Sequence, residues 1–187
     1  LSRFTWKGNE FNVRTVCHPA QDMISAHIDS HLHTGIKFHF PYPTGIHTDN
    51  ACDWDANDKH STEVLKQDTQ SAVLKRTLDS TVYYVELKWE GKALLKEKEK
   101  NYFVLLPQED AFSFSCAFTA NEPDQLTVLP DFFEVESLAK NHWVNFWEEG
   151  AAVDFSHCTD PRAKELERRV VLSQYLLAIQ CAGSTPP

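Results

Sequence analysis

An alternation of apolar and polar residues, running from Arg3 to about Thr127, constrains this chain more than any other feature. Runs such as "VYYVELKWEG" and "FSFSCAFTA" place apolar side chains at every second position, which is typical of β-strands with one buried face. About nine such runs follow one another, separated by short polar or glycine-containing links, and this spacing is typical of antiparallel sandwiches. We therefore predict a mainly β fold, with an antiparallel β-sandwich domain over residues 1–130.

Three segments refine this prediction. "FTWKGNEFNVRTV" contains two alternating runs around Lys7-Gly8-Asn9, which indicates a hairpin. "STEVLKQDTQSAVLKRTL" has the length of a helix, but its charges do not gather on one helical face, so strands are preferred. "KALLKEKEK", residues 92–100, alternates in charge sign and predicts a solvated hairpin or a sheet edge.

After Pro130 the pattern becomes helical. "ESLAKNHWVNFWEEG" predicts a tryptophan-rich helix with Ser137 as its N-cap and Gly150 as its C-terminal stop. We assign this helix to a linker over residues 131–158.

A second, longer helix is predicted from about Pro161 to Ala182, within a third segment of residues 159–187. Thr159 and Asp160 offer an N-cap, and the proline after them suits the first helical position. The apolar residues of this helix are Leu166, Val170, Leu172, Tyr175, Leu176, Leu177 and Ile179. A sandwich filled by its own side chains has at most one face to offer such a helix. We therefore expect the helix to be covered on one side only, or by a second copy in a homo-oligomer, with Gly183–Pro187 leading away from the sandwich.

Composition excludes several classes of function. The net charge of −9 argues against a nucleic-acid partner, because phosphate contacts need clustered lysine and arginine. No apolar run approaches the roughly 18–20 residues of a membrane-spanning helix, so no membrane partner is assigned. The five cysteines are too scattered for a disulfide framework or a C-x-x-C pair, and Cys116, in an alternating run, is expected to be a buried thiol.

The densest group of polar functional side chains lies in "FPYPTGIHTDNACDWDANDKHST", residues 40–62. From Asp53 onward, the first three ligand positions of a calcium loop are matched. However, the sixth position is Asp58 instead of glycine, and the twelfth is Val64 instead of glutamate. We assign no metal and no cofactor.

Two other interpretations of this loop stay open. Trp54, flanked by Asp53 and Asp55, offers an apolar platform for a sugar face beside acceptors for its hydroxyl groups. Alternatively, the acidic residues cap turns and the tryptophan packs on the sheet edge. A loop this long is uncommon in a compact sandwich unless it has a use.

The sequence offers no catalytic constellation. Cys17 and His18 are adjacent, and neighbours on a strand point to opposite faces. Glu148 and Glu149 are adjacent on a predicted helix and do not face one substrate. No serine stands in a G-x-S-x-G context, and we assign no catalytic residue.

The order of the segments resembles the front part of bacterial six-hairpin glycosidases, the (α/α)₆-barrel glycoside hydrolases related to the maltose and kojibiose phosphorylases and to α-L-fucosidases of that architecture. The resemblance rests on "FPYPTGIHTDNACDW", on the following β-rich stretch, and above all on "W-x-x-F-W" followed by "ELERRVVLSQYLLAIQ", Trp143 to Gln180. It covers essentially the whole chain and is more specific for architecture than for substrate.

The resemblance implies a β-supersandwich, a linker with a tryptophan-rich helix, and a helix leading into a catalytic barrel. It places the catalytic carboxylates in that barrel, with no counterpart in this sequence. It also implies that a loop of the β-domain reaches the mouth of the barrel, which makes Tyr42, His47, Asp53 and Trp54 the candidate substrate-binding residues. A periplasmic or secreted location is a further implication.

We therefore expect the non-catalytic N-terminal part of an enzyme that hydrolyses or phosphorolyses glycosidic bonds. Its expected partners are the catalytic barrel and, through the full enzyme, a carbohydrate substrate. The alternative is a stand-alone carbohydrate-binding or adhesive β-sandwich module.

Overall fold

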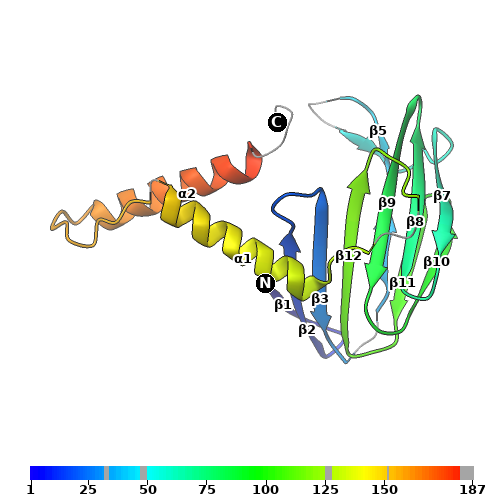
Figure 1. Ribbon diagram of the computed structural model, residues 1–187, viewed down its shortest axis with the longest axis horizontal. Helices are drawn as coiled ribbons and strands as arrows, with labels where there is room; N and C mark the ends of the chain where they lie inside the picture. Colours follow the sequence, from blue (N-terminus) through cyan, green and yellow to red (C-terminus); the bar gives the residue numbers. More distant parts are fainter. Residues whose placement is uncertain (32–33, 47–49, 125–127, 151, 182–187) are drawn as a thin grey trace. The chain divides into compact units, whose positions relative to one another are not determined.

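The computed structural model describes residues 1–31, 34–46, 50–124, 128–150 and 152–181 (Figure 1). These residues form three antiparallel sheets and two helices, which confirms the predicted mainly β fold. Contacts divide the chain into two compact units, Leu1–Lys140 and Asn141–Pro187.

The largest sheet has seven strands. Their order is β1 (Ser2–Trp6), β2 (Asn9–Cys17), β3 (Met23–Asp29), β12 (Ala111–Thr119), β9 (Thr81–Trp89), β8 (Ser71–Leu78) and β7 (His60–Gln67). A second sheet has the order β10 (Ala93–Glu99), β11 (Tyr102–Pro107) and β4 (Ile36–His39). A third, small sheet joins β5 (Tyr42–Pro43) and β6 (Cys52–Asp53).

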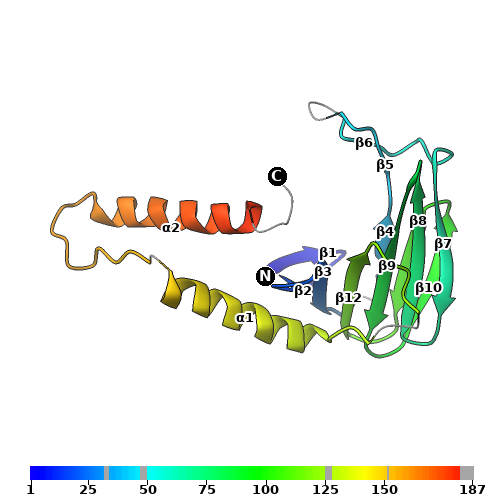
Figure 2. The ribbon, with the colours of Figure 1, turned by 45° about the horizontal axis from the view of Figure 1, so that its top comes forward.

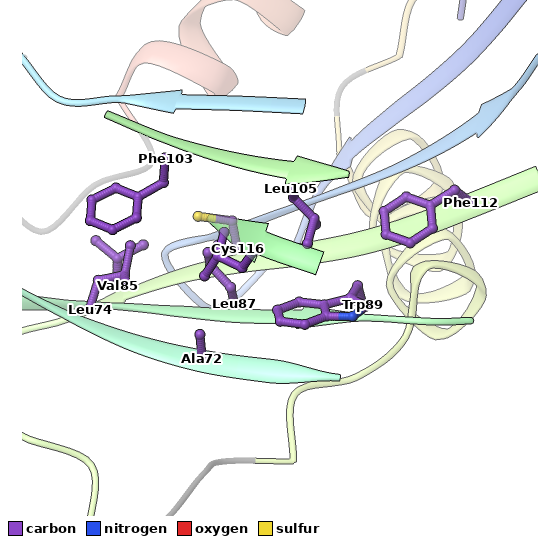
Figure 3. Close-up of a cluster of buried hydrophobic side chains, with 10 residues drawn as sticks. Ala72, Leu74, Val85, Leu87, Trp89, Phe103, Leu105, Phe112 and Cys116 are labelled. Atoms are coloured by element: carbon purple, nitrogen blue, oxygen red, sulfur yellow. The ribbon is translucent and has the colours of Figure 1, made fainter. Parts of the chain in front are cut away.

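The main core lies between the seven-stranded and three-stranded sheets, as expected for a sandwich (Figure 3). Leu87 and Trp89 of β9 and Phe103 and Leu105 of β11 are all buried in one cluster. Burying such a side chain fully stabilises the fold by roughly 1.5–3 kcal/mol. Cys116 of β12 belongs to the same cluster, and burial raises the pKa of its thiol to about 12. The predicted buried thiol is confirmed.

The three local predictions within the sandwich are confirmed. Lys7 and Gly8 form a two-residue turn with positive φ values of 50° and 77°, and Trp6 pairs with Asn9 across it. These angles match a type I′ turn, whose twist suits a hairpin. The segments around residues 60–67 and 71–78 are paired strands, not a helix. Strand β10 lies at a sheet edge, and only Leu95 among its residues is buried.

The first helix, α1 (Phe132–Glu149), begins earlier than predicted. The Asp131 carboxylate accepts a hydrogen bond from the Glu134 amide at 2.9 Å, and the Glu134 carboxylate accepts one from the Asp131 amide at 2.9 Å. This reciprocal capping box satisfies two amides at the start of the helix. Ser137 as the N-cap was therefore wrong, because it lies within the helix. The predicted stop at Gly150 is confirmed.

The start of α1 packs on the sandwich. Phe132 and Val135 are fully buried, and Val135 joins Met23 and Leu129 in a second apolar cluster. The Arg14 guanidinium donates to the Glu136 carboxylate at 2.9 Å. Hydrophobic burial and this ion pair together fix the first turns of α1 on β2 and β3.

The second helix, α2 (Ala163–Gln180), begins two residues after Pro161, so the predicted proline at the first helical position was wrong. The Asp160 carboxylate accepts a hydrogen bond from the Arg162 amide at 2.8 Å. The Ala163 amide donates to the Asp160 carbonyl at 3.0 Å. These two bonds form a tight turn that precedes the regular helix.

Much of the apolar face of α2 is exposed within the second unit. The prediction that the sandwich covers at most one side of this helix stays a prediction. Within the second unit, Tyr175 contacts Trp143, with ring centroids 5.1 Å apart. The exposed apolar residues of α2 are Leu166, Leu172, Tyr175, Leu176, Leu177 and Ile179, each 40–65% exposed. The predicted course of Gly183–Pro187 lies outside the described residues.

We expect the Asp131→Ala variant to lower the free energy of unfolding by roughly 0.5–2 kcal/mol, because the first turn of α1 loses its side-chain acceptor. Urea denaturation measures this change. Asp131→Asn is the matched control, since asparagine caps helices about as well as aspartate. Equal losses in the two variants would contradict a capping role.

Candidate functional site

The loop of residues 40–62 is built on the small sheet of β5 and β6, which follows the end of β4 (Figure 2). Tyr42 pairs with Asp53, and Pro43 pairs with Cys52. This register brings two of the four predicted substrate-binding residues opposite each other. Trp54 follows directly in the chain, whereas His47 lies outside the described residues.

Tyr42 uses its hydroxyl group to hold the loop to the sandwich. The hydroxyl donates to the Asp79 carboxylate at 3.0 Å, and this hydrogen bond is the main cause of the raised pKa of Tyr42. The Lys59 ammonium lies 5.3 Å from the centroid of the same ring. Tyr42 therefore links the loop to the turn between β8 and β9.

Trp54 is the aromatic residue that the loop presents to solvent, and its side chain is 50% exposed. Its ring centroid lies 4.7 Å from that of His39 at the end of β4, and His39 in turn contacts Tyr102 at 5.1 Å. Packing on His39 orients the indole while leaving half of it accessible. Such a surface can stack on the apolar face of a sugar ring.

Asp53 supports the turn that places Trp54. Its carboxylate accepts a hydrogen bond from the Asp55 amide at 3.0 Å. A carboxylate can accept about four hydrogen bonds, so this contact leaves capacity for a ligand hydroxyl. Both interpretations of the loop thus have a structural counterpart, since Asp53 caps a turn and Trp54 offers a half-exposed platform.

A buried polar cluster that was not predicted from the sequence lies beneath this loop. Its centre is Arg76 of β8, whose side chain is 1% exposed. The two hydrogens of its Nη1 group are shared among several acceptors, which include His60 Nδ1 at 2.9 Å, Thr62 Oγ1 at 2.7 Å and Asn101 Oδ1 at 3.3 Å. The guanidinium carbon lies 4.8 Å from the centroid of the Phe40 ring. Within the described part of the chain, no carboxylate forms an ion pair with Arg76.

The sequence did contain a signal for this cluster. Ala72 and Leu74 point into the core from alternate positions of β8, and Arg76 is the next residue on that face. An arginine at an inward position has to be desolvated, which costs free energy unless polar or aromatic partners replace its water. Its partners come from other strands and a distant turn, and the sequence does not identify them.

His60 is held neutral by its surroundings. Desolvation lowers the pKa of His60 most, and the positive charge of Arg76 adds to that effect, followed by Lys100 and His39. A neutral ring whose Nδ1 accepts from Arg76 carries its hydrogen on Nε2. The Nδ1 lone pair is thus occupied, so His60 is a structural partner of Arg76 and no general base.

Asn101 completes the anchor. It is fully buried with a φ of 63°, in the left-handed region where asparagine is tolerated better than most residues. Its side-chain amide donates to the Asn57 carbonyl at 3.3 Å and to the His60 carbonyl at 3.4 Å. The turn between β10 and β11 therefore fixes the end of the loop.

Two classes of site find no support in the described residues. No group of three or more His, Cys, Asp or Glu side chains in that part of the chain is arranged to hold a metal ion. Among the described helices, none is long and apolar enough to cross a membrane.

No protein-family model matches this chain, and no curated protein matches it in sequence.

The lowered pKa of His60 predicts a pH dependence of stability. The unfolded chain, with an ordinary histidine pKa of 6.5, binds a proton more tightly than the folded protein does. The contribution of neutral His60 to the free energy of unfolding is therefore complete above pH 6.5. It declines as the pH falls below 6.5 towards the lowered pKa of the folded protein.

We expect the His60→Gln variant to show less of this decline, because glutamine does not titrate and its carbonyl can still accept from Arg76. Urea denaturation between about pH 7.5 and about pH 5 measures the difference. A constant difference in unfolding free energy between the two proteins across that range would contradict the prediction.

Proposed function

We propose that this chain is the non-catalytic N-terminal part of a carbohydrate-active enzyme that hydrolyses or phosphorolyses glycosidic bonds. In this proposal the β-domain and its loop of residues 40–62 shape the active site, and α2 supports a catalytic barrel of helices. The observation that carries the proposal is the apolar face of α2 that the second unit itself leaves exposed.

The energetic argument concerns the second unit alone. The six apolar residues of α2 that are 40–65% exposed forgo much of their burial energy. Full burial of one such side chain is worth roughly 1.5–3 kcal/mol, so the exposed face forgoes on the order of 5 kcal/mol or more. That amount is a large fraction of the net stability of a typical domain. Further helices packed on α2 would recover it, as in an (α/α)₆ barrel.

The carbohydrate part of the proposal rests on Trp54 and Asp53 together with the resemblance to six-hairpin glycosidases. The half-exposed indole and the adjacent carboxylate match the two needs of sugar recognition, an apolar platform and hydrogen-bond acceptors. The same pair also favours the second candidate, a stand-alone carbohydrate-binding β-sandwich module. The two candidates differ in whether α2 belongs to a larger helical domain.

We expect purified protein of residues 1–187 to cleave no glycoside, because the proposal places the catalytic carboxylates in the barrel. Assays with aryl glycosides and α-linked disaccharides, with and without phosphate, test this expectation. The proposal would be contradicted if the protein cleaved a glycoside and a substitution of one of its own carboxylates abolished that activity. Sequencing the reading frame that carries this chain gives a second test. The proposal requires that this reading frame encode a run of amphipathic helices after α2.

In the enzyme that carries this chain, we expect Trp54→Ala to raise KM or lower kcat/KM with little loss of stability. A lost stacking contact is worth about 0.5–1.5 kcal/mol beyond burial. The matched control is Phe118→Ala, which truncates a ring of β12 that is 43% exposed and lies outside the loop. A fully active Trp54→Ala enzyme that melts several degrees lower would instead assign the tryptophan a packing role.

A further inference from the structure

The first unit leaves part of its largest sheet uncovered on the side of the main core. The buried residues of that core come from strands β8 to β12, and none of them comes from β1, β2 or β3. Apolar side chains of β1 and β3 that are 40–50% exposed lie on this side, namely Phe4, Trp6 and Ile24. We refer to these three residues as the open sheet face.

Strand pairing places the open sheet face on the core side. Ile24 of β3 is paired with Cys116, a buried residue of the core, and paired residues project from the same side of a sheet. The two rings of β1 line one hollow with Phe112, another buried residue of the core. The first strands therefore continue the inner layer of the sandwich, and part of their apolar surface stays exposed there.

Strand β4 is the edge of the second sheet next to this face. Ile36 of β4 lines the same hollow as the two rings of β1. Among the described strands, β4 pairs only with β11. Phe38 points into the core but is only partly buried, whereas its partner Phe103 on β11 is fully buried. The core side of β4 therefore lacks a neighbouring strand on its free flank.

Two other outer strands carry features that hinder the addition of a strand. Strand β10 is charged over its last four residues. Strand β7 changes register between Val64 and Lys66, and the Lys66 ammonium donates to the Pro123 carbonyl at 2.6 Å. Proteins usually protect exposed sheet edges with charges, bulges or covering loops. Strand β4 has one lysine, Lys37, and an apolar surface beside it, which indicates a natural partner strand at this edge.

Lys37 defines the charge that this partner strand needs. It projects outward from β4, between the inward residues Ile36 and Phe38. Its ammonium lies 6.0 Å from the centroid of the Tyr102 ring, and among the described residues no carboxylate forms an ion pair with it. A cross-strand neighbour of opposite charge stabilises a sheet, and one of like charge destabilises it. The partner strand should therefore carry aspartate or glutamate opposite Lys37 and an apolar residue on either side.

A second copy of the chain does not fit this edge. Phe38 of β4 packs on Phe114 of β12, with ring centroids 5.6 Å apart, so the large sheet lies directly beneath β4. Two copies joined through β4 about a twofold axis would each place β1–β3 where the other copy holds β12 and β9. A single extended segment avoids this overlap, because it adds only one strand above the open sheet face.

We propose that the β4 edge is completed by one extended segment of the larger polypeptide to which the proposed function assigns this chain. The segment adds a strand to β4, directs alternate apolar side chains onto the open sheet face, and places an acidic residue opposite Lys37. The source of the segment rests on the proposed function, since one larger polypeptide would cover both this face and the exposed residues of α2. The docking surface itself belongs entirely to the first unit.

The first test adds the blocked pentapeptide Thr-Val-Glu-Val-Thr to purified protein of residues 1–187 and follows the backbone amides by NMR. The peptide reads the same in both directions, so it offers two inward valines and one outward glutamate to either strand orientation. We expect binding in the millimolar range, with shifts of the β4 amides. Thr-Val-Lys-Val-Thr should bind about threefold more weakly or worse, and Lys37→Glu should reverse this preference.

Lys98→Glu is the matched control, because it reverses an exposed lysine on β10, at the opposite edge of the same sheet. It should leave the preference between the two peptides unchanged. Absence of binding by both peptides would overturn the proposal, as would equal binding of both or shifts confined to β10. A dimer of the 1–187 protein with β4 in its interface would also overturn it.

The second test compares the 1–187 protein with the enzyme that carries it. We expect the β4 amides to exchange with deuterium more slowly in the complete enzyme, where the segment already occupies the edge, and the glutamate peptide not to bind there. Equal exchange and equal peptide binding in the two proteins would overturn the proposal. An enzyme that cleaves glycosides while its β4 edge stays open would contradict this inference alone. A covered edge in a polypeptide without a catalytic barrel would support the added strand and contradict the proposed function.

Discussion

The Arg76 guanidinium joins both sheets at the end of the sandwich that carries the loop of residues 40–62. It bonds His60 and Thr62 on β7 and Asn101 in the turn between β10 and β11, and it covers the Phe40 ring. A buried positive charge is expensive to desolvate, and removal of its partners would leave that charge uncompensated. Here neutral hydrogen-bond acceptors and the face of the Phe40 ring replace the water around the guanidinium. The geometry of this end of the sandwich therefore depends on all of these partners.

This anchor explains how the described part of the loop can hold Trp54 in a defined position. The hydrogen bonds of Asn101 fix the residues that lead into β7, and the Tyr42 hydroxyl group fixes the small sheet to Asp79. Trp54 lies between these two attachments and keeps half of its surface in solvent. The exposed apolar face of α2 differs from the surface around Trp54. It consists mainly of aliphatic side chains along a helix, and no comparable set of buried polar groups supports it among the described residues.

Much of the sandwich could be predicted because alternation is a local signal. The charge pattern of β7 and β8 distinguished these strands from a helix. The Lys7-Gly8 turn could be predicted because Gly8 and Asn9 are residue types that favour tight turns with positive φ values. The cap of α1 was missed although "DFFE" at residues 131–134 is a capping-box pattern, because Ser137 is an equally ordinary cap by residue type. The Arg76 cluster was missed for a different reason. Its partners come from separate strands and turns, and one sequence does not show which residues tertiary structure brings together.

The charged edge of the second sheet has a consequence for the chain in concentrated solution. Among the described strands, β10 pairs only with β11, and such a free edge is a template on which another molecule can add a strand. The residues Lys96, Glu97, Lys98 and Glu99 are all exposed along it. An incoming strand would have to desolvate this row of alternating charges and match its order. The alternating charges of β10 therefore disfavour aggregation at this edge of the sandwich.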